Sequence, residues 1–158
     1  MKKIRLNLLI AGVIVMVCGA FFSSCSDKDE EITYLISLNE LPMDAQTFLN
    51  DFFPSEKART VEKQSIGKVI MYNVELDNGY DMLFNEDGLW QEVSAPENKT
   101  LPSGIAPEAI EEYVVKNYPD YGINEINRTG DGYNVEIIGG VRLTFNSLGE
   151  CTGTFPDL

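Results

Sequence analysis

The sequence predicts an α+β fold in which two tandem repeats each supply one helix and a four-stranded antiparallel sheet. The helices are expected on one face of the sheet, and the opposite face is expected to be concave and open. An internal repeat supports this, because Tyr-Asn-Val-Glu at residues 72–75 recurs 61 residues later at 133–136. Self-similarity at a fixed offset indicates one supersecondary unit that has been copied. Within each copy, the hydrophobic pattern changes from helical to strand periodicity at a proline.

The N-terminal 24 residues predict a lipoprotein signal peptide. Three basic residues among the first five precede an apolar run over residues 6–17, and two serines precede Cys25. The run is shorter than the roughly 20 residues of a membrane-spanning helix, so a retained anchor is the weaker alternative. Small residues directly before a cysteine resemble the lipobox of bacterial lipoproteins. This resemblance implies lipidation at Cys25, although Cys18 is a competing site with a poorer match.

Residues 25–40 are expected to form an acidic tether. The run Ser-Asp-Lys-Asp-Glu-Glu at 26–31 is similar to the export signal of Bacteroidetes lipoproteins, which implies an outer-membrane location and exposure at the cell surface. Without residues 1–24, nine basic and 25 acidic residues remain, a net charge of −16. Nucleic acid is excluded as a partner, because phosphate binding needs a basic surface. Cys151 would be the one free thiol, so no intramolecular disulfide is expected.

Each repeat is expected to begin with a short amphipathic helix bounded by prolines. Between Pro42 and Pro54, one helical stripe carries Ala45, Phe48, Leu49 and Phe52. The segment between Pro107 and Pro119 repeats the pattern with apolar residues at 110, 113 and 114. Proline at either end of a helix is tolerated because the backbone N–H it lacks has no helical partner there.

The rest of each repeat predicts antiparallel strands joined by tight turns. In the first copy, residues 72–76 and 80–84 alternate apolar and polar side chains around the turn at 77–79, and a further strand covers 89–93. The turns at 85–88 and 146–149 begin with asparagine and end with glycine, which is typical of a type I turn with a glycine bulge. Additional strands near 58–64 and 122–127 would give a sheet of up to eight strands.

These motifs resemble the PepSY-like, beta-lactamase-inhibitor-like domains of Bacteroidetes lipoproteins. The resemblance rests on Leu-Pro at 41–42, Phe-Pro at 53–54, the strand and turn at 72–79, and the segment from Phe84 to Trp90. It covers two domains, residues 41–96 and 97–158, and the second is looser because Cys151 replaces the tryptophan. The resemblance implies helices packed on a curved sheet, but it transfers no inhibitory residues.

Catalytic and metal-binding interpretations are weak. The chain contains no histidine, so the usual general base and the commonest metal ligand are both missing. Residues 65–68 spell the Ser-x-x-Lys spacing of a nucleophile pair, but they fall in a connection between strands rather than at the start of a helix. The acidic residues at 77, 81, 86 and 87 fit turns better than a calcium loop. No catalytic residue, metal site or cofactor is therefore predicted.

Function is expected on the sheet face opposite the helices. Trp90 and Cys151 are expected to face the helices as core residues, with Trp90 opposite Phe84. Alternation places nine other residues on the open face: Asn73, Glu75, Asp81, Leu83, Gln91, Asn134, Glu136, Arg142 and Thr144. A polar sheet face is often simply solvated, but this one also suits the docking of a protein or peptide.

The sequence thus predicts a non-enzymatic envelope lipoprotein that binds a protein or peptide partner, with inhibition of a hydrolase as one form of that role. Contact with the membrane is expected through the lipid anchor alone. The alternatives are a structural or accessory lipoprotein without a discrete ligand, and a binder of small molecules or glycans. Exposure of both Trp90 and Tyr80 would favour the glycan alternative.

Overall fold

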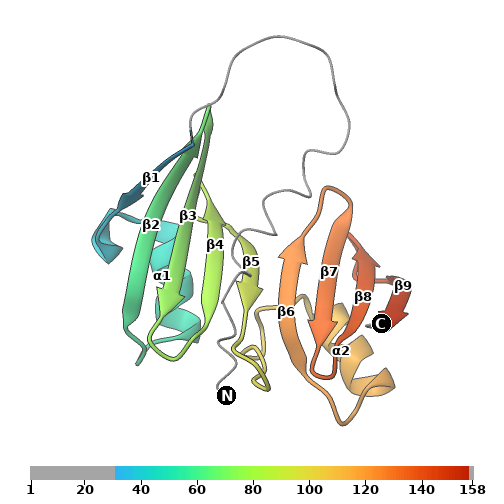
Figure 1. The fold of residues 1–158 in the computed structure, drawn as a ribbon. Helices are drawn as coiled ribbons and strands as arrows, with labels where there is room; N and C mark the ends of the chain where they lie inside the picture. The colour runs from blue at the N-terminus through green and yellow to red at the C-terminus, as the bar shows by residue number, and fades with distance from the viewer. Residues whose placement is uncertain (1–30, 157–158) are drawn as a thin grey trace, which may run out of the picture.

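A computed structural model describes residues 31–156 and contains two α-helices and one antiparallel sheet of nine strands (Figure 1). The strand order in the sheet follows the chain from β1 to β9, so every strand pairs with its neighbours in sequence. None of the described helices is long and apolar enough to cross a membrane. The predicted signal peptide and Cys25 lie outside the described residues.

The sheet falls into a first set of strands before α2 and a second set after it. The strands are β1 (Glu31–Leu35), β2 (Ala58–Ile66), β3 (Val69–Leu76), β4 (Asp81–Asn85), β5 (Trp90–Ser94), β6 (Ile123–Arg128), β7 (Gly132–Ile137), β8 (Val141–Asn146) and β9 (Cys151–Pro156). A short 3-10 helix, η2 (Leu38–Glu40), leads into the first α-helix.

The two predicted helices are confirmed as α1 (Met43–Phe52) and α2 (Glu108–Asn117). Pro42 and Pro107 stand at the N-cap of these helices, one position before the first helical residue. Each helix buries the two residues at the centre of its apolar stripe, which are Ala45 and Leu49 in α1, and Ile110 and Val114 in α2. The helices are therefore held by packing on the sheet, as expected for segments of only ten residues.

The strand register of the first repeat recurs in the second. Tyr72 pairs with Phe84, which in turn lies opposite Trp90. In the second copy, Tyr133 pairs with Phe145, which lies opposite Cys151. A register shift follows Leu83 in one copy and Thr144 in the other, at equivalent positions. The predicted position of Trp90 opposite Phe84 is confirmed.

The sequence predicts up to eight strands, and the structure has a ninth. Residues 31–35 fall within the range assigned to the acidic tether, but they form β1, and all five of them pair with residues of β2. All five residues of β1 are exposed. Its sequence, Glu-Ile-Thr-Tyr-Leu, alternates polar and apolar side chains, but none of them is buried, so β1 extends the sheet without adding to the core.

Both helices lie behind the sheet in the view of Figure 1, where they cover the apolar side of the strands. The Phe48 ring of α1 lies 5.5 Å from the Phe84 ring of β4, and the Tyr113 ring of α2 lies 5.4 Å from the Phe145 ring of β8. Both pairs have edge-to-face geometry, which aromatic rings favour. One contiguous hydrophobic core extends through both repeats. We call this side of the sheet the helix face and the other the open face. The concavity of the open face stays a prediction.

The two repeats join through the pairing of β5 with β6, which we call the seam. Its register comprises three residue pairs, and the central pair, Val93 with Ile126, is fully buried on the helix face. The amide Nδ2 of Asn124 donates to the carbonyl of Lys99 at 2.7 Å and fixes the connection that leads to α2. The Tyr80 hydroxyl donates to the carbonyl of Thr100 at 2.7 Å and holds the same connection against the first repeat.

A glycine in the turn after β4 allows that turn to approach the start of α1. Gly88 has a φ of +87°, and a Cβ at this position would lie 2.8 Å from the backbone nitrogen of Ala45. Gly149 has a φ of +78° and approaches Ala109 at the start of α2 in the same way. Each turn is capped by its asparagine, since Oδ1 of Asn85 accepts from the N–H of Leu89 at 2.9 Å, and Asn146 makes the equivalent bond to Glu150.

We expect Gly88→Ala to lower the free energy of unfolding by about 1–3 kcal/mol, because the new Cβ meets helix backbone and the residue retains a positive φ. Urea denaturation of the variant and the wild type measures the difference. Gly130→Ala is the matched control, because a Cβ at Gly130 has no neighbour within 4 Å. Equal losses of stability in the two variants would contradict the account of this contact.

Candidate functional site

The open face carries two parallel rows of polar residues that cross the seam. The carboxylate row runs across paired strands. The amide row lies beside it, two residues away on each strand. The carboxylate row consists of Glu75, Asp81, Ser94, Glu125, Glu136 and Arg142. The amide row consists of Asn73, Leu83, Glu92, Asn127, Asn134 and Thr144.

The rows contain every residue predicted for the open face except Gln91. Gln91 lies at the register shift of β5, and Glu92 takes the position opposite Leu83. A bulge places one extra residue in the strand, so simple alternation from Trp90 assigns the wrong neighbour to the open face. The glycine-bulge turn recognised at residues 85–88 was the signal from which this shift could have been deduced.

Sequence reasoning missed four residues on the open face at the seam, namely Glu92, Ser94, Glu125 and Asn127. Glu125 lies opposite Ser94, and Asn127 lies opposite Glu92. The strand near residues 122–127 was expected, but its faces could not be assigned without its partner. Pairing with β5 decides which side of β6 joins the core, because Ile126 must lie beside Val93.

Arginines neutralise the carboxylates toward the two ends of the carboxylate row. Nη1 of Arg59 lies 2.6 Å from Oε1 of Glu75, and Nε of Arg142 lies 3.5 Å from Oε2 of Glu136. Arg59 also approaches Asp77, with 3.7 Å between Nε and Oδ1. These partners are largely exposed, so each pair contributes little stability, but each cancels local charge.

The centre of the open face holds three partly buried carboxyl groups, Asp81, Glu92 and Glu125, which we call the central carboxylates. Burial raises the pKa of Asp81 to about 6, and Glu75 adds to the increase. Burial raises the pKa of Glu92 to about 7, with further contributions from Glu125 and Asp81. Burial also raises the pKa of Glu125, and so does Glu136, while Arg142 acts in the opposite direction.

The register explains why these three groups interact. Glu92 pairs with Leu83 and Asn127, while Asp81 and Glu125 both flank Ser94. Glu92 is therefore diagonal to Asp81 on one side and to Glu125 on the other. Diagonal positions on one sheet face are about 7–8 Å apart, well within the reach of glutamate side chains. Each neighbouring charge that acts on the pKa of Glu92 is a carboxylate, so the repulsion on this group is uncompensated.

Hydrogen bonding relieves only part of this repulsion. With the Asn73 amide oriented toward Asp81, its Nδ2 donates to Oδ1 of Asp81 at 2.9 Å and to the carbonyl of Met82 at 3.1 Å. This bond favours the ionised form of Asp81, but its pKa remains raised. Among the described residues, no group of three or more His, Cys, Asp or Glu side chains is arranged to hold a metal ion.

The apolar and aromatic candidates are less exposed than the glycan-binding alternative requires. Leu83, expected to be an exposed leucine, is half-buried within the amide row. Trp90, Tyr80 and Cys151 are half-buried and pack against the core, so Cys151 is less enclosed than expected. The two rows therefore offer carboxylates and amides rather than an aromatic platform, and the exposed ring of Phe155 lies beyond Arg142 at the end of the carboxylate row.

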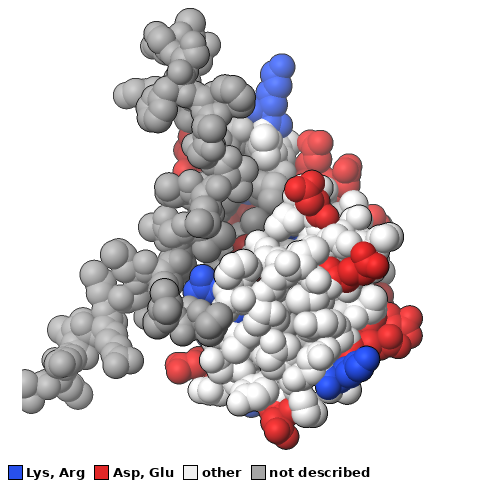
Figure 2. Space-filling view, turned by 90° about the vertical axis from the view of Figure 1, so that its right-hand side faces the viewer, with Lys and Arg blue, Asp and Glu red and all other residues white. Residues whose placement is uncertain are grey.

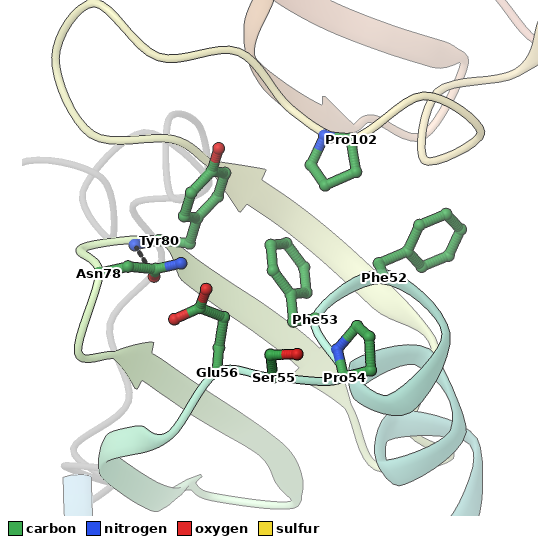
Figure 3. Close-up of a pocket in the computed structure, with 8 residues that line it drawn as sticks. All are labelled: Phe52, Phe53, Pro54, Ser55, Glu56, Asn78, Tyr80 and Pro102. Carbon is green, nitrogen blue, oxygen red and sulfur yellow. Dashed lines mark hydrogen bonds between the residues drawn. The ribbon is translucent and has the colours of Figure 1, made fainter.

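A separate hollow of about 210 Å³ lies where the end of α1 meets the β3–β4 turn and Pro102 (Figure 3). Figure 3 shows Phe53 pointing into this hollow from α1, with Tyr80 and Asn78 on the turn opposite. Glu56 is the only carboxyl group in its lining. Burial raises the pKa of Tyr80, and Glu56 adds to the increase, so the phenol stays protonated. Ser55 also lines this hollow, but among the described residues no hydrogen bond joins its hydroxyl to Glu56, as a paired nucleophile and base would require.

The Ser-x-x-Lys segment forms the turn between β2 and β3. Ile66 pairs with Val69 around Gly67 and Lys68, and Gly67 has a φ of +59°. Ser65 pairs with Ile70 inside the ladder, so it does not stand at the first turn of a helix. The structure thus lacks the local geometry that this nucleophile pair requires.

Charge is unevenly distributed over the surface. Figure 2 views the end of the molecule that lies at the right of Figure 1, near β9 and α2. This end is mostly uncharged, with carboxylates around its margin and few basic side chains.

Comparison with known proteins identifies similar sequences and folds. The chain matches the family model described as "Putative beta-lactamase-inhibitor-like, PepSY-like" over residues 28–82 and again over residues 70–152. No curated protein matches the chain.

Three crystal structures of Bacteroides proteins are similar to this one. A "putative periplasmic protein" of Bacteroides vulgatus ATCC 8482 is 29% identical, with a TM-score of 0.74 over 78% of this chain and 96% of that one. A "putative calcium-regulated periplasmic protein" of Bacteroides thetaiotaomicron is 28% identical, with the same TM-score and coverage. A second B. vulgatus protein, "of unknown function", is 25% identical, with a TM-score of 0.72 over 80% of this chain and 99% of that one.

We expect Glu92→Gln to stabilise the protein at pH 8 and to have little effect at pH 5. A carboxyl group with a raised pKa binds its proton more tightly in the folded state, so the unfolding free energy rises as pH falls through about 7 and levels off near the ordinary value of 4.5. The gain at pH 8 should be about 1 kcal/mol, because solvent screens a carboxylate that is still partly exposed. Urea denaturation at the two pH values measures it.

Glu112→Gln, at an exposed position of α2, is the control and should show no such difference between the two pH values. A Glu92→Gln protein that is less stable than the wild type at pH 8 would contradict the account of uncompensated repulsion.

Proposed function

The chain belongs to the PepSY-like family, and from that premise we propose that it is a non-enzymatic envelope protein that binds a protein or peptide partner through its open face. The observation that carries this proposal is the set of central carboxylates, whose charge the face offsets only in part. A partner that carries lysine or arginine side chains would supply the missing positive charge. Inhibition of a hydrolase is one form that such binding could take.

Charge complementarity supports a basic partner. Carboxylates that are already partly desolvated lose less hydration when a partner covers them, while they gain a charged hydrogen bond. The amide row adds donors and acceptors from Asn127 and Asn134 beside them. Such a surface suits an extended or flat protein segment better than a small molecule, which usually binds in a concave and mostly apolar pocket.

The site chemistry supports a role other than catalysis. The sequence has no histidine, and the Ser-x-x-Lys segment is a strand-to-strand turn. The hollow beside Tyr80 is lined by Ser55 and Glu56, and among the described residues no hydrogen bond joins the side chains of these two. These observations favour binding, in agreement with the description of the family as inhibitor-like.

The similar Bacteroides proteins are described as periplasmic, which supports export of this chain to the envelope. We further propose lipidation at Cys25, attachment to the outer membrane through the lipid alone, and exposure at the cell surface. The sequence around Cys25 supports this, because a basic segment, an apolar run and two serines precede it.

Binding is tested by pull-down from envelope extract with residues 26–158, which contain the whole described body. The open-face variant combines Asp81→Asn, Glu92→Gln and Glu125→Gln, which removes three ionisable carboxyl groups and retains side-chain shape. We expect the wild type to retain a protein with a basic surface segment. The variant should recover at least tenfold less of that protein. Glu75 and Glu136 are left intact because each pairs with an arginine.

The matched control combines Asp51→Asn, Glu108→Gln and Glu112→Gln, three exposed positions on the helices. This control removes the same number of carboxyl groups and should retain the partner. Direct binding of the recovered protein is then measured with both variants at 50 and 200 mM salt. This comparison distinguishes contacts made by the open face from attraction to the overall negative charge of the protein. Equal binding by the open-face variant and the wild type would contradict the proposal and favour a structural or accessory lipoprotein.

The anchor is tested with Cys25→Ser in the full chain. We expect the wild type to fractionate with the outer membrane and to incorporate labelled fatty acid, because lipid attachment needs the Cys25 thiol. The variant should incorporate no label, and it should no longer fractionate with the outer membrane. Labelling of the variant would assign the lipid to another residue, and Cys18→Ser would then show whether Cys18 carries it.

A further inference from the structure

The seam has a different chemical character on each face of the sheet. It comprises three residue pairs, fewer than any other strand pairing among the described residues. On the helix face, side chains from β5, β6 and β7 contact one another across it. On the open face, carboxylates from both repeats stand close together. The helix face therefore stabilises the pairing of β5 with β6, whereas repulsion on the open face opposes it.

The helix face of the seam is held together by a cation stacked on two aromatic rings. The guanidinium carbon of Arg128 lies 4.0 Å from the centre of the Trp90 ring and 5.5 Å from that of Tyr133. Nε of Arg128 donates to the carbonyl of Trp90 at 3.0 Å. Because Trp90 belongs to β5 and Arg128 to β6, these contacts bind one repeat to the other.

The open face of the seam carries the central carboxylates. Asp81 and Glu92 come from the first repeat, and Glu125 comes from the second. Glu92 and Glu125 occupy diagonal positions across the seam, because Glu125 lies two residues before Asn127, the partner of Glu92. Like charges at such positions oppose pairing of the two strands.

We propose that the seam is a pH-sensitive joint, which the ionised central carboxylates loosen by repulsion and which tightens when they take up protons. Loosening changes the contact between the repeats at the place where the two polar rows cross it. This device belongs to the fold itself and operates without a partner. The raised pKa values of about 6 for Asp81 and about 7 for Glu92 place the change near neutral pH.

The charged neighbours of the central carboxylates come from every strand that flanks them on the open face. Glu62 of β2 and Glu75 of β3 act on Asp81, and Arg59 pairs with Glu75. On the other side, Glu136 of β7 raises and Arg142 of β8 lowers the pKa of Glu125. Repulsion therefore exceeds attraction at the centre.

The composition of the chain makes the transition easy to assign. The protein contains no histidine, which is the side chain that ordinarily titrates between pH 5 and 8. It also contains a single tryptophan, Trp90, which lies at the seam against Arg128. Fluorescence of the native protein thus reports the junction without a label. The sheet separates Trp90 from the carboxylates, so direct quenching by them is not expected.

The test is a fluorescence titration of residues 26–158 from pH 5.5 to pH 8. We expect a sigmoidal change in Trp90 emission with a midpoint between pH 6 and 7. The variant Asp81→Asn, Glu92→Gln, Glu125→Gln should show no transition, because its amides stay neutral throughout. The control Asp51→Asn, Glu108→Gln, Glu112→Gln should titrate like the wild type.

Amide hydrogen exchange of Val93 and Ile126 gives a second readout of the seam itself. After correction for the pH dependence of the chemical exchange rate, we expect opening at these amides to be at least fivefold more favourable at pH 8 than at pH 5.5 in the wild type. The central-carboxylate variant should show equal opening at both values. A flat wild-type titration, a transition that survives in the variant, or pH-independent opening of both amides would overturn the proposal. None of these outcomes depends on a partner, so they leave the proposed binding function to its own test.

Discussion

Val93 and Ile126 face each other across the seam, and the pairing of their strands is the contact on which the rest of the structure depends. It turns two short sheets into one nine-stranded sheet and brings the cores under α1 and α2 together. Each repeat alone would expose the edge of β5 or β6, whose unpaired backbone groups invite non-native pairing. The bonds from Asn124 and Tyr80 to the connecting segment hold that segment close, which reduces the chain entropy opposing the pairing.

The same pairing creates the electrostatic character of the open face. Neither repeat carries the full set of central carboxylates, so the cluster exists only when β5 and β6 are paired. Burial and mutual repulsion there make ionisation costly, whereas arginines relieve the carboxylates further out. A polar arrangement that disfavours its own fold near neutral pH is more easily explained as part of a function than as packing, since a purely structural face could use neutral side chains.

Local patterns were enough to predict the helices and hairpins, and long-range pairing was not. The prolines at 42 and 107 and the apolar stripes predict both helices, because these features act within one or two turns. The asparagine and glycine of each turn predict the hairpin and its bulge. In contrast, β1 pairs with β2 across the intervening η2 and α1, and Glu125 can be assigned to the open face only when β6 is known to pair with β5. Most of the candidate face, including Asp81, was therefore predictable, but Glu92 and Glu125 at its centre were not.

The most direct test of the account is whether the two repeats unfold as one unit through the seam. Native-state hydrogen exchange at pH 6 under increasing urea gives the opening free energy of Val74 and Phe84 in the first repeat, and of Val135 and Phe145 in the second. The account predicts that all four amides converge on one free energy with one dependence on urea, because the core is continuous. Two separate values, one for each repeat, would contradict it and show that the repeats are independent units that merely touch at β5 and β6.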